Sequence, residues 1–332
     1  MPPVDLDYGV TFQTCVTVEN PSDVRERFLG FCEDRILLQK LNNIRVVDSI
    51  QHVVACTNYI VLGQYNIPED IIFHYTSKDV LASILDKGHL WLSHYGSMND
   101  FAEIEYSLNI LWHCIQGKID KMATLGVYKA VRNALMDDLY IYLTSFSRAP
   151  NLLSQWRAYA PEDGVSIGFA AQMFRSKEFP DVELILDDVI YDETIQFEKM
   201  SSLAVHIAEI IGRFHRNISN LECEVRKLRN EFCRVGAFLK HSGFSEEREV
   251  RLVAFGDGMP RHTRQGRYGP VEFVKLNLGS LFSATDELDV PICYVITGPS
   301  RDADAAVKAV ADLFYRFKTK FYAVFDCAIP LR

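Results

Sequence analysis

The chain has 332 residues, of which 48% are hydrophobic, 24% are charged and 12% are aromatic. This length and composition are typical of a globular protein of one large or two ordinary domains, and they exclude the disordered, collagen-like and low-complexity classes. The formal net charge of −9 argues against binding nucleic acid mainly by phosphate neutralisation, so a nucleic acid partner would be a substrate held at one local site.

The sequence shows no sign of export or of membrane insertion. Its start lacks a basic segment followed by an apolar stretch, and no run reaches the ~18 apolar residues of a membrane span. The eight cysteines are scattered, without CxxC pairs or zinc-finger spacing, which favours buried thiols in a reducing compartment. We therefore expect a cytoplasmic protein without a metal or a membrane partner. The oligomeric state stays open.

The chain is expected to divide at about residue 70. Residues 1–70 are predicted to be an N-terminal accessory region, whose later part is rich in β-branched residues and favours strands. Residues 71–332 are predicted to form the main domain.

Short strands and helices follow one another from residue 71 onward. The sequence predicts a strand at 71–75, then a helix with Thr76 or Ser77 as its N-cap and Gly88 at its left-handed C-terminal cap, then a strand at 90–93. The later predictions, in chain order, are a helix opened at 99–100, a strand at 139–147, a short helix capped by Asn151, strands at 164–169, 182–191, 249–255, 271–278 and 293–297, a helix around 305–314, and a strand at 321–326.

Residues 195–239 have helical periodicity. Within them, apolar residues from Ile218 to Leu239 alternate steps of three and four, as in a heptad repeat. Because the repeat spans only about three heptads, we expect an internal helix packed on the sheet rather than a dimerising coiled coil. Long helices mixed with short strands, without regular βαβ alternation, favour an α+β fold.

Several common catalytic motifs are absent from the sequence, namely the Walker A loop, GxGxxG, HExxH and GxSxG. Three polar clusters remain as candidate sites. The first is His74-Tyr75-Thr76, where the predicted strand meets the predicted helix. A His there can hydrogen-bond a ligand hydroxyl, and the helix N-terminus favours a phosphate. A structural His beside a Thr cap is the alternative.

The second cluster is Ser145-Phe146-Ser147, at the end of the strand predicted for 139–147. Strand alternation places both hydroxyls on one face and Phe146 on the other. Because apolar residues precede the serines on their face, the strand end is a candidate pocket wall. Ordinary strand-end serines explain the pattern equally well.

The third cluster is Glu247-Arg248-Glu249-Val250-Arg251. Strand alternation places Glu247, Glu249 and Arg251 on one face. The two carboxylates repel, so one is expected to have a raised pKa or to bind a substrate hydroxyl, while Arg251 can hold a carboxylate or a phosphate. A solvated, charged strand face is the alternative.

In this order the motifs resemble an uncharacterised bacterial domain-of-unknown-function family, with the pattern HYTS, ILxxGxLWLS, NDxxE, FxxExExR and IPLR. The resemblance extends over residues 71–332. Its matching segments are 73–77, 84–93, 98–103, 145–147, 153–159, 164–169, 244–251, 298–299 and 329–332.

The opening HxT and ILxxGxL pieces also resemble DarT-type ADP-ribosyltransferase toxins. More broadly, a His on the first strand, a strand with paired serines and a later ExE resemble the ADP-ribosyltransferase superfamily. This resemblance implies an ADP-ribosyltransferase-like mixed sheet core with flanking helices, and NAD as co-substrate. Carried onto this chain, it implies that His74 and Thr76 bind the adenosine side of NAD. It also implies that Ser145 and Ser147 line the nicotinamide-ribose pocket.

The same resemblance implies that Glu249 is the catalytic carboxylate, which fixes a ribose hydroxyl and stabilises positive charge as nicotinamide leaves. Glu247 would orient or deprotonate the acceptor. The remaining implied contacts are Tyr75, Trp156 and Arg251 for the cofactor, and Asn99, Asp100 and Arg157 for the substrate.

The leading hypothesis is therefore an NAD-dependent ADP-ribosyltransferase that modifies a nucleic acid or a protein, as a toxin or anti-phage effector. An NAD or nucleotide glycohydrolase and a non-catalytic nucleotide-sensing or protein-interaction module are the alternatives. Arg261, Arg264 and Arg267 lie in a predicted glycine-containing loop, which is either a substrate-contacting lid or a solvated loop.

Overall fold

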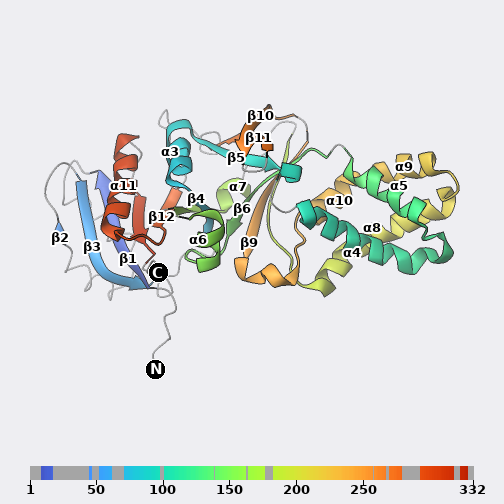
Figure 1. Cartoon of the computed structure of the whole chain (residues 1–332), viewed down its shortest axis with the longest axis horizontal. Helices are drawn as coiled ribbons and strands as arrows, with labels where there is room; N and C mark the ends of the chain where they lie inside the picture. Colours follow the sequence, from blue (N-terminus) through green and yellow to red (C-terminus); the bar gives the residue numbers. More distant parts are fainter. Residues whose placement is uncertain are drawn as a thin grey trace, which may run out of the picture. The chain divides into compact units, whose positions relative to one another are not determined.

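The computed structural model divides the chain into two compact units (Figure 1). The first unit comprises Met1–Leu90, Phe146–Lys177 and Leu276–Arg332, and the second comprises Trp91–Ser145 and Glu178–Lys275. The residues that the structure describes are 9–17, 45–46, 52–61, 71–97, 101–137, 139–161, 164–175, 182–256, 258–266, 269–278, 292–317 and 322–327.

The described helices and strands alternate irregularly along the chain. The helices are α3 (Lys78–Lys87), η2 (Tyr95–Ser97), α4 (Phe101–Ile119), η3 (Asp120–Met122), α5 (Leu125–Met136), α6 (Leu153–Tyr159), α7 (Gln172–Arg175), α8 (Glu193–Phe214), α9 (Ile218–Arg226), α10 (Arg229–Gly236), η4 (Ser242–Glu247) and α11 (Ala303–Arg316), where η marks a 3₁₀ helix. The strands are β1 (Gly9–Thr17), β2 (Arg45–Val46), β3 (His52–Val61), β4 (Ile71–Thr76), β5 (His89–His94), β6 (Ile141–Ser147), β7 (Val165–Ala170), β8 (Glu183–Asp188), β9 (Glu249–Phe255), β10 (Arg261–Gly266), β11 (Gly269–Asn277), β12 (Ile292–Thr297) and β13 (Tyr322–Asp326).

The first unit is built on a sheet with the strand order β4-β7-β12-β13-β1-β3-β2. Neighbouring strands are antiparallel except for the parallel pair β12–β13. The strands β1, β2 and β3, from the predicted accessory region, thus belong to the same unit and sheet as the C-terminal strand β13. The helix α11 packs on β12 and β13.

The strand β4 and the helix α3 form as the sequence predicts. The side chain of Ser77, rather than that of Thr76, caps α3 by accepting a hydrogen bond from the amide of Val80 at 3.3 Å. Gly88 ends the helix with φ 62°, and its amide donates to the carbonyl of Ile84 at 2.8 Å. This left-handed position favours glycine because a side chain there would clash with the backbone.

The second unit combines a cluster of helices with short strands. The helices α4, α5, α8, α9 and α10 lie side by side (Figure 1), and their apolar faces share one core with residues of β6 and β9. The side chains of Leu111, Ile115, Ile207 and Val225 are fully buried in it. In this unit β9 pairs with β8 and β6, β5 pairs with β6, and β10 pairs with β11.

These elements confirm the predicted α+β class, with mostly antiparallel strands and flanking helices. Similarity to the ADP-ribosyltransferase core stays a prediction. Among the cysteines whose burial the structure describes, Cys233 and Cys327 are buried as expected, whereas Cys223 is exposed and Cys114 is half-buried.

The prediction of one internal helix up to Leu239 is wrong. The segment forms α9 and α10, separated by a turn at 227–228, and α8 ends before them. The side chain of Asn217 starts α9 by accepting from the amide of Asn220 at 3.1 Å. Most apolar residues of the apparent heptad still face the core, because a short turn keeps the apolar sides of both helices directed towards it. Leu221, Val225, Phe232 and Leu239 are buried, whereas Ile218 is exposed.

Two smaller predictions are also corrected. Asn151 does not cap α6: its side chain accepts a hydrogen bond from the indole of Trp156 at 2.8 Å and donates to the carbonyl of Cys327 at 2.9 Å. The predicted arginine loop is instead the strand β10, which carries Arg261 and Arg264 and forms an antiparallel hairpin with β11.

We expect Gly164→Ala to destabilise the protein by about 2 kcal/mol, because overpacking against backbone atoms forces the chain to shift. A Cβ at Gly164 would lie 2.5 Å from the carbonyl oxygen of Ala160. The backbone of Gly164 is also held in place, because its carbonyl accepts a hydrogen bond from the amide of Gly298. Urea unfolding measures the change. The control is Gly117→Ala within α4, where a Cβ meets no atom within 4 Å. This variant should gain about 0.5–1 kcal/mol. Equal stability of Gly164→Ala and the wild type would contradict the packing described.

Candidate active site

The ExE motif lies at a sharp bend rather than along one strand. Glu247 ends the 3₁₀ helix η4, and Glu249 is the first residue of β9. Arg248 between them has φ 45°, a left-handed conformation that is uncommon for a residue other than glycine. The prediction that Glu247 lies on a strand face with Glu249 is therefore wrong, yet both carboxylates approach the same cation.

That cation is Lys240, which belongs with Arg251 to a buried ion-pair cluster. The Nζ of Lys240 lies 2.7 Å from Oε2 of Glu247 and 3.0 Å from Oε2 of Glu249. Arg251 donates from Nε to Oε1 of Glu249 at 2.8 Å and from Nη2 to Oε2 at 3.0 Å. Its Nη1 donates to the carbonyl of Ala237 at 2.7 Å, just after α10. The prediction that Arg251 can hold a carboxylate is confirmed.

A third carboxylate comes from the helix α4. Glu103 in the first turn of α4 places Oε1 2.9 Å from Nζ of Lys240, and its Oε2 accepts from Nη2 of Arg251. Three carboxylates and two cations thus meet within the second unit. We call Glu103, Lys240, Glu247, Glu249 and Arg251 the carboxylate–cation cluster.

The surroundings of Glu249 and Glu103 shift the pKa values of these two carboxyls in opposite directions. Burial by itself would raise the pKa of Glu249, but Arg251, Lys240 and a hydrogen bond from Ser145 outweigh it and lower the pKa to about 2. Burial raises the pKa of Glu103, with the negative charge of Glu249 adding to the effect. The sequence led us to expect that one carboxyl of Glu247 and Glu249 has a raised pKa or binds a substrate hydroxyl. The pKa of Glu249 is lowered instead, and a raised pKa is found at Glu103, which the sequence did not indicate.

Solvent reaches the cluster through two of its members. The side chains of Glu103 and Glu247 are 19% and 16% exposed, compared with 7% for Glu249 and 4% for Lys240 and for Arg251. A ligand would therefore meet Glu103 and Glu247 first. Glu249 lies behind them as a fixed negative charge whose two oxygens bind the chain's own cations.

The two predicted serines have different surroundings. Ser145 hydrogen-bonds Glu249, which joins β6 to the cluster within the second unit. Ser147 belongs to the first unit, is 1% exposed, and accepts a hydrogen bond from the amide of Ala149 at 2.9 Å. The hydrogen bond between Ser147 and Ala149 stabilises a local turn at the end of β6.

The HYT cluster lies in the first unit, on β4. The ring of His74 is half-buried and meets the ring of Phe146 edge-on, at 5.7 Å between centroids. The hydroxyl of Tyr75 donates to the carbonyl of Ala149 at 2.7 Å, which gives it a structural role. Thr76 is buried at the end of the strand.

The other predicted contacts are distributed over the first unit or lie outside the described residues. Trp156 is 2% exposed and packs in the core, where its indole donates to the side chain of Asn151. Arg157, one residue later on α6, is exposed. Asn99, Asp100 and Arg267 lie outside the described residues.

Sequence reasoning did not assign a site role to Lys240 or Glu103. A signal for Lys240 was present, since it is a single charge directly after the apolar stretch 235–239, and a lysine in such a place is buried only if carboxylates surround it. Glu103 was part of the NDxxE motif, but nothing in the sequence indicated which distant residues it contacts.

Within the described ranges, no group of His, Cys, Asp or Glu side chains has an arrangement that could hold a metal ion. The oxygens of the cluster contact Lys240 and Arg251 instead. Of the helices in the described part of the chain, none has the length and apolar character needed to cross a membrane.

The fold and site together define an α+β protein with a buried carboxylate–cation cluster. Residues 155–252 match the family described as "Protein of unknown function (DUF2971)". This match confirms the predicted resemblance to a domain-of-unknown-function family, and it includes every member of the cluster except Glu103. Comparison with curated proteins and with solved structures gives no significant match.

We expect the stability of the protein to fall as the pH falls from about 4.5 towards 2, in part because Glu249 must then be protonated. A carboxyl whose pKa is lower in the folded than in the unfolded chain stabilises the fold above its unfolded pKa, and that contribution is lost as the pH falls through the folded pKa. The raised pKa of Glu103 acts in the opposite direction. Urea unfolding over this pH range should give a flatter profile for Glu249→Gln.

At pH 7 the same variant should lose about 3–5 kcal/mol, since Lys240 and Arg251 remain buried without Glu249, the more buried of the two carboxylates that contact both of them. The control is Glu224→Gln, which breaks an exposed ion pair with Lys227 and should change stability by less than about 1 kcal/mol. An unchanged pH slope in Glu249→Gln would contradict the pKa assigned to Glu249.

Proposed function

We propose that the protein is an NAD-dependent ADP-ribosyltransferase that uses the carboxylate–cation cluster to cleave the bond between nicotinamide and ribose. The observation that carries the proposal is the hydrogen bond from Ser145 to an ionised, buried Glu249. The motif resemblance assigns these two residues to one pocket although they are 104 positions apart (249 − 145).

Cleavage of the bond between nicotinamide and ribose requires a fixed negative charge near the ribose. The glycosidic bond breaks with its electron pair going to nicotinamide, and positive charge develops on the ribose as in glycoside cleavage. A carboxylate that is already oriented and ionised stabilises this charge without reorganisation. The cluster with all its groups ionised has three negative and two positive charges, and its net charge has the required sign.

Glu247 suits the acceptor side of the reaction. Its Oε2 binds Lys240, and its side chain is more exposed than that of Glu249. In the proposed reaction the acceptor nucleophile forms a bond to the ribose carbon that nicotinamide leaves, and Glu247 orients the acceptor or takes its proton. Water in place of the acceptor would give NAD hydrolysis instead.

The roles that the resemblance implies for His74, Thr76, Ser147 and Arg157 fall in the first unit and stay predictions from the sequence. The acceptor is a macromolecule, either a nucleic acid or a protein, and the setting is a bacterial cytoplasmic toxin or anti-phage effector.

A non-catalytic nucleotide-sensing module is the second candidate function. The observation that favours it is that both carboxylate oxygens of Glu249 already have partners in the chain. Both oxygens bind Arg251, and one of them also binds Lys240. A ribose hydroxyl would have to share those oxygens. In this case NAD would bind saturably and would not be consumed.

We expect the purified protein, incubated with labelled NAD and bacterial nucleic acid or protein, to release nicotinamide and to transfer label to the acceptor. Glu249→Gln should lower nicotinamide release at least about 100-fold, since a preorganised charge is worth on the order of 3 kcal/mol in such transition states. Ser145→Ala should lower it by a smaller factor. Glu247→Gln should reduce label transfer more than nicotinamide release.

Thermal unfolding of each variant separates loss of chemistry from loss of fold, and Glu224→Gln is the matched control for removing a carboxylate far from the cluster. Saturable NAD binding without nicotinamide release would favour the sensing module. Equal release by the wild type and by folded Glu249→Gln would overturn the assignment of Glu249.

A further inference from the structure

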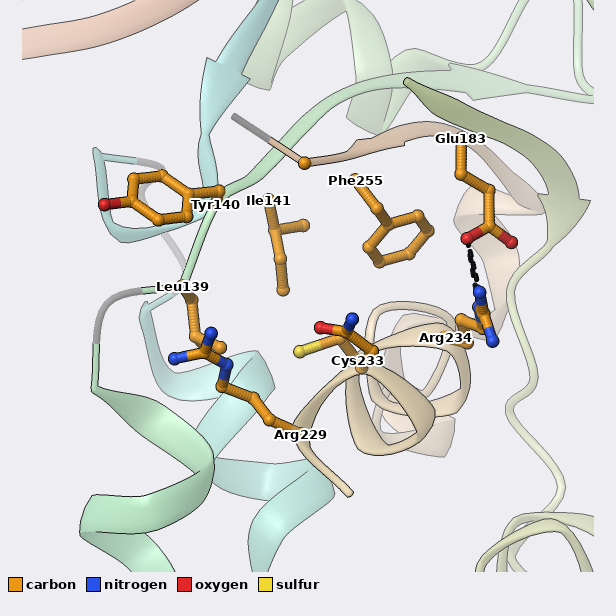
Figure 2. A pocket seen from close by; sticks show the side chains of 10 residues that line it. Leu139, Tyr140, Ile141, Glu183, Arg229, Cys233, Arg234 and Phe255 are labelled. Carbon is orange, nitrogen blue, oxygen red and sulfur yellow. Dashed lines mark hydrogen bonds and ion pairs between the residues drawn. The ribbon is translucent and has the colours of Figure 1, made fainter. Parts of the chain in front are cut away.

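The second unit contains a pocket of ≈ 400 Å³ between α10 and the strands β6, β8 and β9 (Figure 2). This volume lies within the range of roughly 300–1,000 Å³ that is typical of small-molecule sites. On one side the pocket is lined by residues of α10. On the other side it is lined by residues of β6, β8 and β9 or next to them.

One wall of the pocket is apolar. Leu139, Ile141 and Phe255 line it, and Cys233 of α10 faces them across the space in Figure 2. Burial raises the pKa of the Cys233 thiol to about 12, so this group stays neutral and behaves as part of the apolar wall. A flat apolar group would be removed from water here.

The pocket is cationic at one end. Arg229, the first residue of α10, donates from Nη1 to the carbonyl of Asp137 at 2.8 Å, and no described residue gives its guanidinium a carboxylate partner. Tyr140 lines the same end in Figure 2, and the guanidinium of Arg261 lies over its ring at 4.7 Å. Nε and Nη2 of Arg229 therefore remain as donors for an oxyanion.

The other end is electrically neutral. Arg234 forms an ion pair with Glu183, with its Nη2 2.7 Å and its Nε 3.1 Å from the same carboxylate oxygen. Figure 2 shows this pair on the opposite side of the pocket from Arg229. The pocket thus has an apolar middle, one cationic end and one end where the charges already cancel.

This site is separate from the carboxylate–cation cluster. Glu249 begins β9 and Phe255 ends it, six residues later. At a rise of about 3.3 Å per residue the two ends of the strand are roughly 20 Å apart. No member of the cluster lines the pocket.

We propose that this pocket binds a small organic anion, in which a carboxylate or phosphate group pairs with Arg229 and a flat apolar body lies between Cys233 and the side chains of Ile141 and Phe255. The charge contrast supports this occupant. Arg229, Arg234 and Glu183 give the lining a net positive charge, in a chain whose formal net charge is −9.

Calorimetric titration of the full chain, without NAD, tests the proposal with four probes: benzoate, phenyl phosphate, inorganic phosphate and benzyl alcohol. Benzoate, phenyl phosphate or both should bind saturably. Inorganic phosphate lacks the apolar body and benzyl alcohol lacks the charge, so each should bind at least about tenfold more weakly. The stronger of the two aromatic anions identifies the carboxylate or the phosphate as the preferred group.

Arg229→Gln should weaken binding of the aromatic anion at least about tenfold, and Arg229→Lys should weaken it less because the charge remains while the planar fork is lost. Arg226→Gln, which removes an exposed arginine of α9 outside the pocket, is the matched control and should bind as the wild type does. Thermal unfolding verifies that each variant is folded. Absence of saturable binding of both aromatic anions, or equal binding by Arg229→Gln and the wild type, would overturn the proposal.

Discussion

The second unit depends on the compensation of two buried cations. Lys240 and Arg251 are almost inaccessible to solvent, and a buried charge without a partner costs several kcal/mol. Their partners come from separate places in the sequence, with Glu103 on α4, Glu247 on η4 and Glu249 on β9. The fold brings these carboxylates to the two cations, so the cluster links the start of α4, the segment after α10, η4 and the start of β9.

The same constraint shapes the chemistry that the site offers. Because Arg251 and Lys240 hold Glu249 ionised, its charge is present before any ligand binds, which is the property that stabilisation of a ribosyl cation requires. The cations also occupy its oxygens, which is why catalysis and mere binding are both chemically reasonable. The more exposed Glu103 and Glu247 are the groups through which the cluster meets solvent.

Local elements were predictable where one short signal decides them. A short apolar run, a Thr or Ser cap and a following Gly indicated β4, α3 and β5, and the apolar run after Glu249 indicated β9. Predictions failed where two local explanations compete. The residues around Leu228 fit a continuous helix as well as two helices joined by a turn, because both keep the same apolar side towards the core. Asn151 fits a cap, but tertiary hydrogen bonds to distant groups take its side chain.

By itself, the sequence determined the α+β class, most of the strands, and the proximity of Glu249 to Arg251, since these follow from periodicity and from residues two positions apart. Only the tertiary structure decided that Glu103 and Lys240 join them, that Glu249 rather than Glu103 has the lowered pKa, and that Trp156 is core. Contacts between positions more than 100 apart bring Glu103 to Lys240 and Arg251, and burial places Trp156 in the core. The pKa of Glu249 depends on how the fold directs Arg251, Lys240 and Ser145 at its carboxylate, which no local pattern in the sequence shows.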